Sequence, residues 1–362
     1  MRNLCIGILA FILSAACSKK SQEIVVGNKF EPQNDGLGKF EPPTGKVLLF
    51  VGQELESIGG TDEYSDGYFD YFPAPAGFTA YTGFGGNGLD GLNSMADWGD
   101  GPENMSLLVN DADFDNSCLA IGLDIANGGD EKTAKGEYDH LILRLGEWIK
   151  ALGNRPVFLR IGYEFDGHDW NHYNSEFYKP AYRRIHQKFE EMGIENVAYI
   201  WQSKGGGSTR ANMEEYYPGD DVVDWVGFSF FTTGEVNHPM IEFARDHKKP
   251  CFIAEASPVI LDNTGTSIHL DLTKTEDAQK AWNEWFTPFF NTVRVNSDVI
   301  KAIHYINSPW KTRPQWQNNP FFKNIDARIT QNEYMKTQWL SEINKECYLM
   351  ASDTLFTYLT KK

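Results

Sequence analysis

The sequence predicts an α/β protein with a (β/α)8 TIM-barrel fold in a single domain. Three observations support this fold class: eight short apolar runs, helix-period stretches between them, and no glycine-rich phosphate loop after the first run. Short, nearly continuous hydrophobic runs are typical of parallel strands buried on both faces, and their alternation with helices indicates β-α-β units. The expected strands span residues 46–52, 77–83, 118–124, 157–164, 197–202, 225–231, 251–255 and 300–306.

Amphipathic helices are expected between these strands. Residues 138–153 and 175–193 carry apolar side chains at helical spacing and close on Gly153 and Gly193, which suit a helix C-terminus. Two further helices are expected over 278–295 and 330–350. The long segments 53–76 and 84–117 follow strands, so we expect them to wall the face where the strands end.

An open, doubly wound sheet is the alternative fold. That fold usually carries a glycine-rich phosphate loop after its first strand. Here residues 52–57 read Gly-Gln-Glu-Leu-Glu-Ser, which lacks both the glycines and a lysine placed to hold phosphate. The barrel is therefore favoured.

Composition limits the classes of function. The chain has 362 residues, of which 41% are hydrophobic and 14% aromatic, as in a folded globular protein. Its net charge of −17 argues against nucleic-acid binding, which needs Lys and Arg surfaces. Surplus Trp and Tyr provide flat faces that can stack on sugar rings. A monomer is expected.

The N-terminus resembles a bacterial lipoprotein signal. Arg2 gives a positive start, residues 6–13 an apolar stretch too short to span a bilayer, and residues 14–17 read Ser-Ala-Ala-Cys. We expect a signal peptide over 1–17 with Cys17 lipidated, a flexible tether over 18–44, and a catalytic domain over 45–362. The protein would then be lipid-anchored in the bacterial cell envelope, in the periplasm or at the cell surface, with the anchor as its sole membrane contact; plain secretion is the alternative.

The remaining cysteines are Cys118, Cys251 and Cys347, and an odd number gives no complete disulfide framework. Cys118 and Cys251 each open an expected strand, where buried free thiols are common. No CxxC or HExxH spacing occurs, so the sequence predicts neither a metal nor a cofactor.

Two glutamates end apolar runs. Glu164 closes Val-Phe-Leu-Arg-Ile-Gly-Tyr-Glu, and Glu255 closes Cys-Phe-Ile-Ala-Glu. A carboxylate at the end of a buried strand needs a task or a partner, and barrels place their chemistry at the C-terminal strand ends. Paired carboxylates are the working groups of glycoside hydrolases. The structural alternative for Glu164 is a buried ion pair with Arg160, which shares its face of the strand.

The order of motifs resembles glycoside hydrolase family 26, the β-mannanase family, over roughly residues 45–345. The resemblance is carried by 160–167 (Arg-Ile-Gly-Tyr-Glu-Phe-Asp-Gly) with Trp170 after it, by 217–231 around the sixth strand, by 254–258 (Ala-Glu-Ala-Ser-Pro) and by Trp310 after the eighth strand. It implies that Glu164 is the acid/base and Glu255 the nucleophile of a retaining reaction. It also implies that Trp201 and Trp310 stack on sugar, and it places Arg160, Tyr163, Asp166, Trp170 and Phe231 in the substrate site.

Two positions depart from the family pattern. Tyr163 stands where the family has His, and Phe231 stands where a Tyr commonly contacts the nucleophile. The second change removes a hydroxyl donor to Glu255 and weakens the nucleophile unless another donor replaces it.

Four cations lie in two loops expected on the catalytic face. They are Lys204, Arg210, Lys311 and Arg313. One hypothesis is that they hold sulfate or uronate groups of an anionic polysaccharide; the alternative is solvated loop charges.

The leading functional prediction is a retaining endo-glycosidase acting on a β-linked polysaccharide, either mannan-like or another plant or algal glycan. Two alternatives remain: a non-catalytic glycan-binding envelope lipoprotein of the same fold, disabled by the change at Phe231, and a transglycosylase using the same double displacement.

Overall fold

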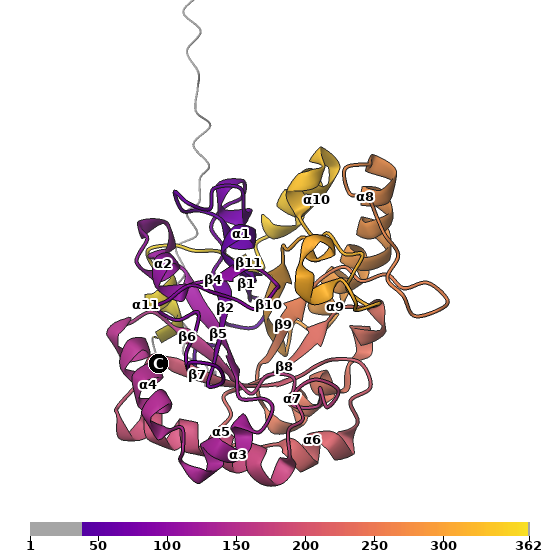
Figure 1. Ribbon diagram of the computed structural model, residues 1–362. Helices are drawn as coiled ribbons and strands as arrows, with labels where there is room; N and C mark the ends of the chain where they lie inside the picture. Colours follow the sequence, from indigo (N-terminus) through magenta and orange to yellow (C-terminus); the bar gives the residue numbers. More distant parts are fainter. Residues whose placement is uncertain (1–37, 361–362) are drawn as a thin grey trace, which may run out of the picture. The chain divides into compact units, whose positions relative to one another are not determined.

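The computed structural model describes residues 38–360. Eight parallel strands close into a barrel (Figure 1), and β10 pairs with β1 from Leu48 opposite Ala302 to Gly52 opposite Ile306. The barrel strands are β1 (Val47–Gly52), β2 (Gly77–Gly83), β5 (Cys118–Asp124), β6 (Val157–Ile161), β7 (Val197–Ser203), β8 (Trp225–Phe230), β9 (Cys251–Ala256) and β10 (Ile300–Ile306). The predicted fold class is confirmed.

Helices surround the barrel strands (Figure 1). They are α1 (Leu55–Ile58), α2 (Met105–Val109), α3 (Gly129–Lys135), α4 (Asp139–Ala151), α5 (Ser175–Glu191), α6 (Arg210–Tyr216), α7 (Pro239–His247), α8 (Thr275–Ala281), α9 (Thr287–Val295), α10 (Glu333–Ile343) and α11 (Leu355–Thr360). Three short strands lie outside the barrel: β3 (Ala96–Asp97) and β4 (Pro102–Glu103) form an antiparallel hairpin, and β11 (Tyr348–Leu349) pairs with β1. Within residues 38–360, no helix combines the length and hydrophobicity needed to cross a bilayer.

Three predicted elements differ from the observed ones by three residues or more at an end. Strand β6 ends at Ile161 instead of reaching residue 164, because Gly162 and Glu164 have φ of 54° and 56° and leave the extended conformation. The helix expected over 278–295 begins at Thr275 and contains a π-helical turn, Trp282–Phe286, between α8 and α9. The helix expected over 330–350 ends at Ile343, and β11 follows it.

The tether prediction is wrong for residues 38–44. Phe40 is only 5% exposed, and its ring centroid lies 5.8 Å from that of Phe158 near the start of β6. The Trp225 indole N–H at the start of β8 donates to the Lys39 carbonyl at 2.7 Å. This segment therefore packs on the N-terminal ends of the barrel strands. The predicted signal peptide, Cys17 and most of the tether lie outside the described residues.

The cysteine predictions can be compared directly. Cys118 and Cys251 are fully buried at the starts of β5 and β9, and neither is in a disulfide. Cys347 is also a free thiol, at intermediate exposure. The two strand cysteines are core residues, as predicted.

Candidate active site

A cleft of about 1000 Å³ lies over the C-terminal ends of the barrel strands. Both Glu164 and Glu255 line it. Its aromatic lining residues are Tyr81, Trp98, Tyr163, Trp170, Phe231, Trp310, Trp316, Phe321 and Phe322. The two glutamates, which come from distant parts of the chain, therefore face one cavity with many flat side chains around them.

Glu255, the penultimate residue of strand β9, is held from two sides. The Arg160 guanidinium on β6 donates to Glu255 Oε1 at 2.6 Å, and the Tyr81 hydroxyl on β2 donates to the same oxygen at 2.8 Å. Arg160 is wholly buried and also donates to the Ala254 carbonyl at 3.0 Å, which fixes its position. Charge-assisted hydrogen bonds of this kind are short and strong, so the two donors fix the position of the Glu255 carboxylate.

Tyr81 supplies the hydroxyl that Phe231 lacks. The Phe231 ring instead packs in an aromatic cluster, with centroids 5.8 Å from Trp310 and 5.1 Å from Phe322. The change at Phe231 was expected to weaken Glu255 unless another donor replaced the lost hydroxyl, and Tyr81 of β2 is such a donor.

Glu164 has a different environment. Its backbone is left-handed, and its carbonyl accepts from the Asn171 side-chain amide at 2.6 Å and from the Gly167 N–H at 2.7 Å. Its carboxyl group accepts from the Ser229 hydroxyl at 2.7 Å and from the Trp170 indole N–H at 3.2 Å. These bonds aim the side chain into the cleft although the residue has left its strand.

The pKa of Glu164 is raised well above its usual value. Removal from bulk water is the largest cause, repulsion from the Glu255 carboxylate comes next, and the Ser229 hydrogen bond opposes both. Burial and the neighbouring carboxylate thus favour the protonated form of Glu164, whereas Glu255 is paired with the Arg160 guanidinium. This is the division into acid and nucleophile that two-carboxylate glycoside hydrolysis requires.

The other predicted substrate residues separate into two groups. Tyr163, Trp170, Phe231 and Trp310 line the cleft, and Arg160 lies behind it under Glu255. Asp166 is only 7% exposed and accepts from the Ser203 hydroxyl at 2.8 Å and the Lys204 N–H at 2.7 Å, so it braces the loop after β7.

Trp201 does not act as a sugar-stacking surface. Its side chain is fully buried and stacks on Phe165 with ring centroids 4.3 Å apart. Although the residue is on strand β7, its ring points outward to the helices and packs against Phe243 of α7 at 5.2 Å. The prediction for Trp201 was wrong, since the residue belongs to the core.

The predicted set of anion-binding cations is not assembled. Arg210 pairs with Asp246 at 2.7 Å and Lys311 with Asp326 at 3.0 Å, while Arg313 pairs with Glu54 and Glu56, each at 2.6 Å. Of the four cations only Lys204 lines the cleft, and its ammonium lies 3.1 Å from the Asp169 carboxylate. The prediction is wrong for the three that do not line the cleft, because carboxylates already neutralise them.

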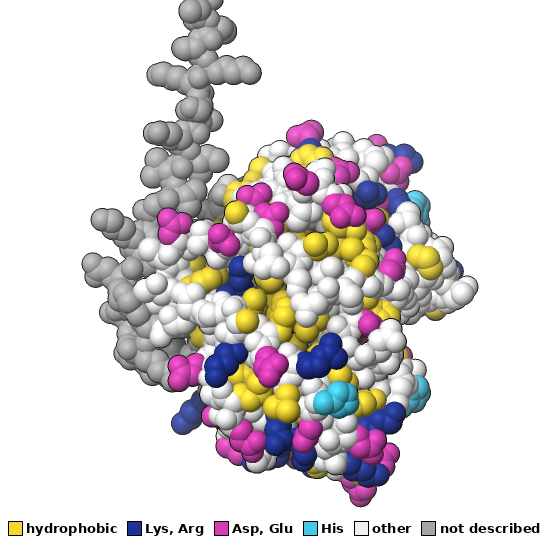
Figure 2. All heavy atoms as spheres, turned by 60° about the vertical axis from the view of Figure 1, so that its left-hand side comes forward, with side chains coloured by type: hydrophobic (Ala, Val, Ile, Leu, Met, Phe, Trp, Pro, Cys, Tyr) yellow, Lys and Arg dark blue, Asp and Glu magenta, His cyan; other side chains and the backbone are white. Residues whose placement is uncertain are grey.

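Carboxyl groups outnumber cations in the cleft lining. Seven of them line it, against a single lysine: Asp90, Asp100, Asp124, Glu164, Asp169, Glu235 and Glu255. On the face drawn in Figure 2, hydrophobic side chains form a central band, and charged side chains of both signs lie around it. In the described part of the chain, no group of three or more His, Cys, Asp or Glu side chains could hold a metal ion.

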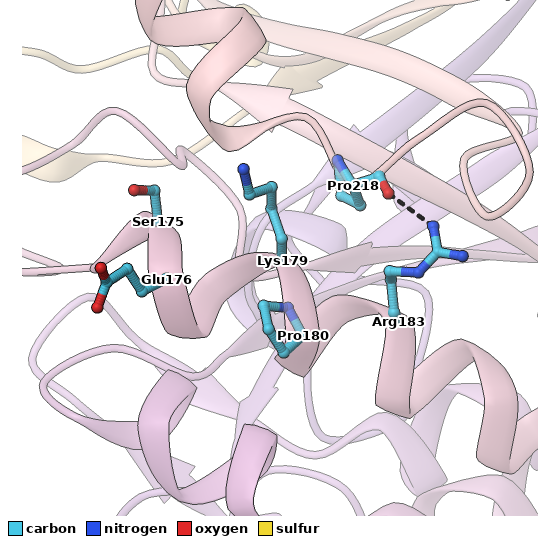
Figure 3. A pocket seen from close by; sticks show the side chains of 6 residues that line it. All are labelled: Ser175, Glu176, Lys179, Pro180, Arg183 and Pro218. Carbon is cyan, nitrogen blue, oxygen red and sulfur yellow. Dashed lines mark hydrogen bonds between the residues drawn. The ribbon is translucent and has the colours of Figure 1, made fainter.

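A second hollow, of about 490 Å³, lies between α5 and the loop after α6. Figure 3 shows Arg183 turned toward the Pro218 carbonyl, to which it donates at 2.8 Å. The residues that line this second hollow are Ser175, Glu176, Lys179, Pro180, Arg183 and Pro218. It has no aromatic face and none of the predicted site residues, so the first cleft is the candidate active site.

Sequence reasoning missed four residues that shape the site: Tyr81, Ser229, Asn171 and Trp98. Tyr81 and Ser229 could have been found from the sequence, because each is a polar side chain near the C-terminal end of an apolar strand. Asn171 and Trp98 sit in loops, where spacing does not indicate which way a side chain points.

A barrel with two carboxyl groups in different environments of one cleft is the architecture of a glycoside hydrolase. Comparison with known proteins gives the family. Glycosyl hydrolase family 26 matches residues 116–312, and the chain belongs to that family. It is therefore a glycoside hydrolase, and the resemblance found in the sequence is confirmed.

Two relatives are similar over most of the chain. One is the beta-1,3-xylanase TXYA of a Vibrio species, 34% identical over 89% of this chain and 70% of its own length. The other is a beta-1,3-xylanase of an Alcaligenes species, 35% identical over 89% of this chain and 68% of its own length.

Solved structures share the fold. The family 26 β-mannanase BoMan26A of Bacteroides ovatus matches with a TM-score of 0.58 at 14% identity, covering 86% of this chain and 93% of that one. An endo-β-1,4-mannanase double mutant of Cellulomonas fimi gives 0.59 at 15% identity, covering 88% and 75%.

Replacing Tyr81 by Phe tests the role of its hydroxyl. We expect kcat/KM to fall roughly 10- to 100-fold, because a hydrogen bond to a charged group contributes about 1.5–3 kcal/mol. The matched control is Tyr199→Phe, since the Tyr199 hydroxyl is buried without a hydrogen-bond partner among residues 38–360. Equal activity of Tyr81→Phe and the control would exclude Tyr81 from the positioning of Glu255.

Proposed function

We propose that this chain is a retaining, endo-acting hydrolase of β-1,3-linked xylan. The opposed environments of Glu164 and Glu255 in one cleft carry the proposal of mechanism. The two relatives that are similar over 89% of the chain, both named beta-1,3-xylanases, support the proposal of substrate.

The first step forms a covalent intermediate. A Glu255 carboxylate oxygen attacks the anomeric carbon while Glu164 gives its proton to the departing glycosidic oxygen, so the C–O bond breaks and the aglycone leaves as an alcohol. Arg160 and Tyr81 hold the attacking carboxylate, and Ser229 and Trp170 hold the acid.

The second step reverses these roles. Glu164, now a carboxylate, takes a proton from water as the water oxygen attacks the anomeric carbon, and Glu255 departs as a carboxylate. Two inversions at one carbon retain the β configuration, and both glutamates return to their starting protonation states.

The charge of the cleft favours a neutral glycan. Six acidic side chains besides the acid Glu164 surround the path of the substrate, and the lysine among them is already paired with Asp169. A sulfated or uronic chain would meet repulsion there, whereas the hydroxyl groups of a neutral chain can donate to these oxygens.

The shape of the cleft favours cleavage inside a chain. A cavity of about 1000 Å³ with nine aromatic lining residues can hold several sugar rings on both sides of the glutamates. Apolar sugar faces pack on such rings.

A substrate screen tests the proposal. The purified chain is incubated with β-1,3-xylan, β-1,4-xylan, β-1,4-mannan and a sulfated galactan, with Glu255→Ala as the blank, and new reducing ends are measured. We expect the highest rate on β-1,3-xylan and products of several lengths early in the reaction. A higher rate on mannan or on the sulfated glycan, or release of single sugars only, would contradict the proposed substrate or mode of attack.

The raised pKa of Glu164 predicts the alkaline limb of the pH profile. The residue must be protonated to act as acid, so kcat/KM falls as pH rises through its pKa. Replacing Ser229 by Ala removes a hydrogen bond that lowers this pKa, so the limb should move to higher pH. Ser203→Ala, which alters a hydroxyl bonded to Asp166, is the control. A limb that stays in place in Ser229→Ala would contradict its assignment to Glu164.

A further inference from the structure

One part of the cleft wall has no role in the two proposed chemical steps. It is formed by the hairpin of β3 and β4 and by the loop after β10. The lining residues in this part are Trp98 and Asp100 of the hairpin, Gln53 after β1, and Gln315 and Trp316 after β10.

Trp98 is an exposed aromatic side chain inside a cavity. It is 45% exposed and stands in the turn that joins β3 to β4. The edge of its indole ring lies close to Gly91. A Cβ atom at position 91 would come within 3.1 Å of the ring carbon Cη2, so glycine leaves room for the Trp98 ring there. A large apolar surface left in water at a cleft wall is unfavourable unless a ligand covers it.

The turn that carries Trp98 is held in place. The Asp97 carboxylate accepts from the Gly99 N–H at 2.7 Å, and the Gly99 carbonyl accepts from the Gln315 N–H at 2.9 Å. The hairpin is thereby joined to the loop after β10. A side chain on a fixed turn binds with a smaller loss of conformational entropy than one on a free loop.

Polar atoms accompany this aromatic surface. Asp100 accepts from the Gln53 side-chain amide at 3.0 Å through one oxygen, while its other oxygen has no hydrogen-bond partner among residues 38–360. The Trp316 indole nitrogen is also unpartnered within the same residues. A flat aromatic surface beside polar side chains of the same cleft wall matches a sugar ring, which has an apolar face and hydroxyl groups at its edge.

The position of this wall assigns it to one side of the scissile bond. Gln53 directly follows β1, and Tyr81 lies near the C-terminal end of the neighbouring strand β2. The Tyr81 hydroxyl donates to the nucleophile Glu255. Trp170, Asp169 and Lys204, in loops after β6 and β7, lie on the side of the acid Glu164, which meets the leaving group.

We propose that Trp98, together with Asp100 and Gln53, forms a subsite for a sugar ring of the glycone, beyond the ring that is attacked. This inference rests on the proposed function. The ligand is a neutral sugar unit of the polysaccharide, stacked on Trp98 and hydrogen-bonded to the two polar side chains. The subsite increases the rate on long chains and leaves the chemistry on short ones unchanged.

Nitrophenyl β-1,3-xylo-oligosides of one to five sugars test the subsite, because they grow on the glycone side only. Wild type should release nitrophenol with a kcat/KM that rises with length. In Trp98→Ala, kcat/KM should fall about three- to tenfold on the longest substrates and stay unchanged on the shortest, through KM more than kcat. Trp98→Phe should recover part of the loss. Tyr71→Ala, which removes an equally exposed aromatic residue outside the cleft, should behave as wild type.

The outcomes separate the two proposals. If wild type releases nitrophenol from none of these compounds, the proposed function fails. If wild type is active and Trp98→Ala shows the same length dependence, the subsite is refuted. Equal loss on short and long substrates would also refute it, because that result places Trp98 in the catalytic centre. A loss confined to unsubstituted oligosaccharides would place Trp98 on the aglycone side and overturn the assignment.

Discussion

Glu255→Ala is expected to lower kcat by about 10⁴-fold or more, since the proposed mechanism assigns the covalent step to the Glu255 carboxylate. Added azide should restore turnover by occupying the space of the lost carboxylate. The product should then be an α-glycosyl azide, because the anomeric carbon undergoes one inversion instead of two. Proton NMR of the product distinguishes the anomers.

Glu164→Ala should differ from Glu255→Ala in the substrates that it still cleaves and in the azide product that it forms. A nitrophenyl leaving group departs without a proton donor, so the first step should persist on aryl glycosides and be lost on polysaccharide. Azide should then yield the β-glycosyl azide, formed on the covalent intermediate. Glu103→Gln is the matched control, because Glu103 is buried outside the cleft wall with a pKa well above its usual value owing to burial. Identical products from the Glu164 and Glu255 variants would contradict their separate roles.

Arg160→Met should have the second largest effect, on stability as well as on activity. Arg160 is fully buried, and its removal leaves Glu255 without its cation at 8% exposure. Breaking a buried ion pair from one side costs about 3–5 kcal/mol of the free energy of unfolding. Denaturant unfolding measures this loss, and kcat/KM should fall in the same variant because the nucleophile is no longer held.

Arg183→Met provides the comparison. Arg183 pairs with Asp221 at 2.5 Å, but the two side chains are 46% and 65% exposed. Solvent screens such a pair, so the loss should stay below about 1 kcal/mol. Equal losses of unfolding free energy in the two variants would show that burial does not increase the contribution of the Arg160–Glu255 ion pair to stability.

The sequence predicted the barrel well because buried parallel strands leave a local signal. Strands β2, β5 and β10 have the expected bounds, since each is a continuous apolar run bounded by polar or turn residues. Strand β6 was predicted too long, because its extension through Gly162 and Tyr163 reads as apolar although the backbone turns left-handed there. Backbone conformation at a functional turn is set by tertiary contacts such as Asn171 with the Glu164 carbonyl.

The site could be predicted only in part. Glu164 and Glu255 were found because a carboxylate at a strand end conflicts with its surroundings. Tyr81 was missed because a tyrosine in a strand looks like core, and Trp201 was assigned to the cleft although its ring faces the helices. The predicted anion site of the loop cations was wrong for a related reason. The carboxylates that pair with these cations, such as Glu54 with Arg313, lie far away in the sequence.

Trapping the covalent intermediate tests the mechanism most directly. A 2-fluoro β-xylo-oligoside with a good leaving group slows the second step more than the first, so the glycosyl-enzyme accumulates and can be digested and sequenced by mass spectrometry. We predict one added sugar chain per protein, attached to Glu255. Attachment to another residue, or inhibition with no covalent adduct, would contradict the double displacement proposed for this cleft.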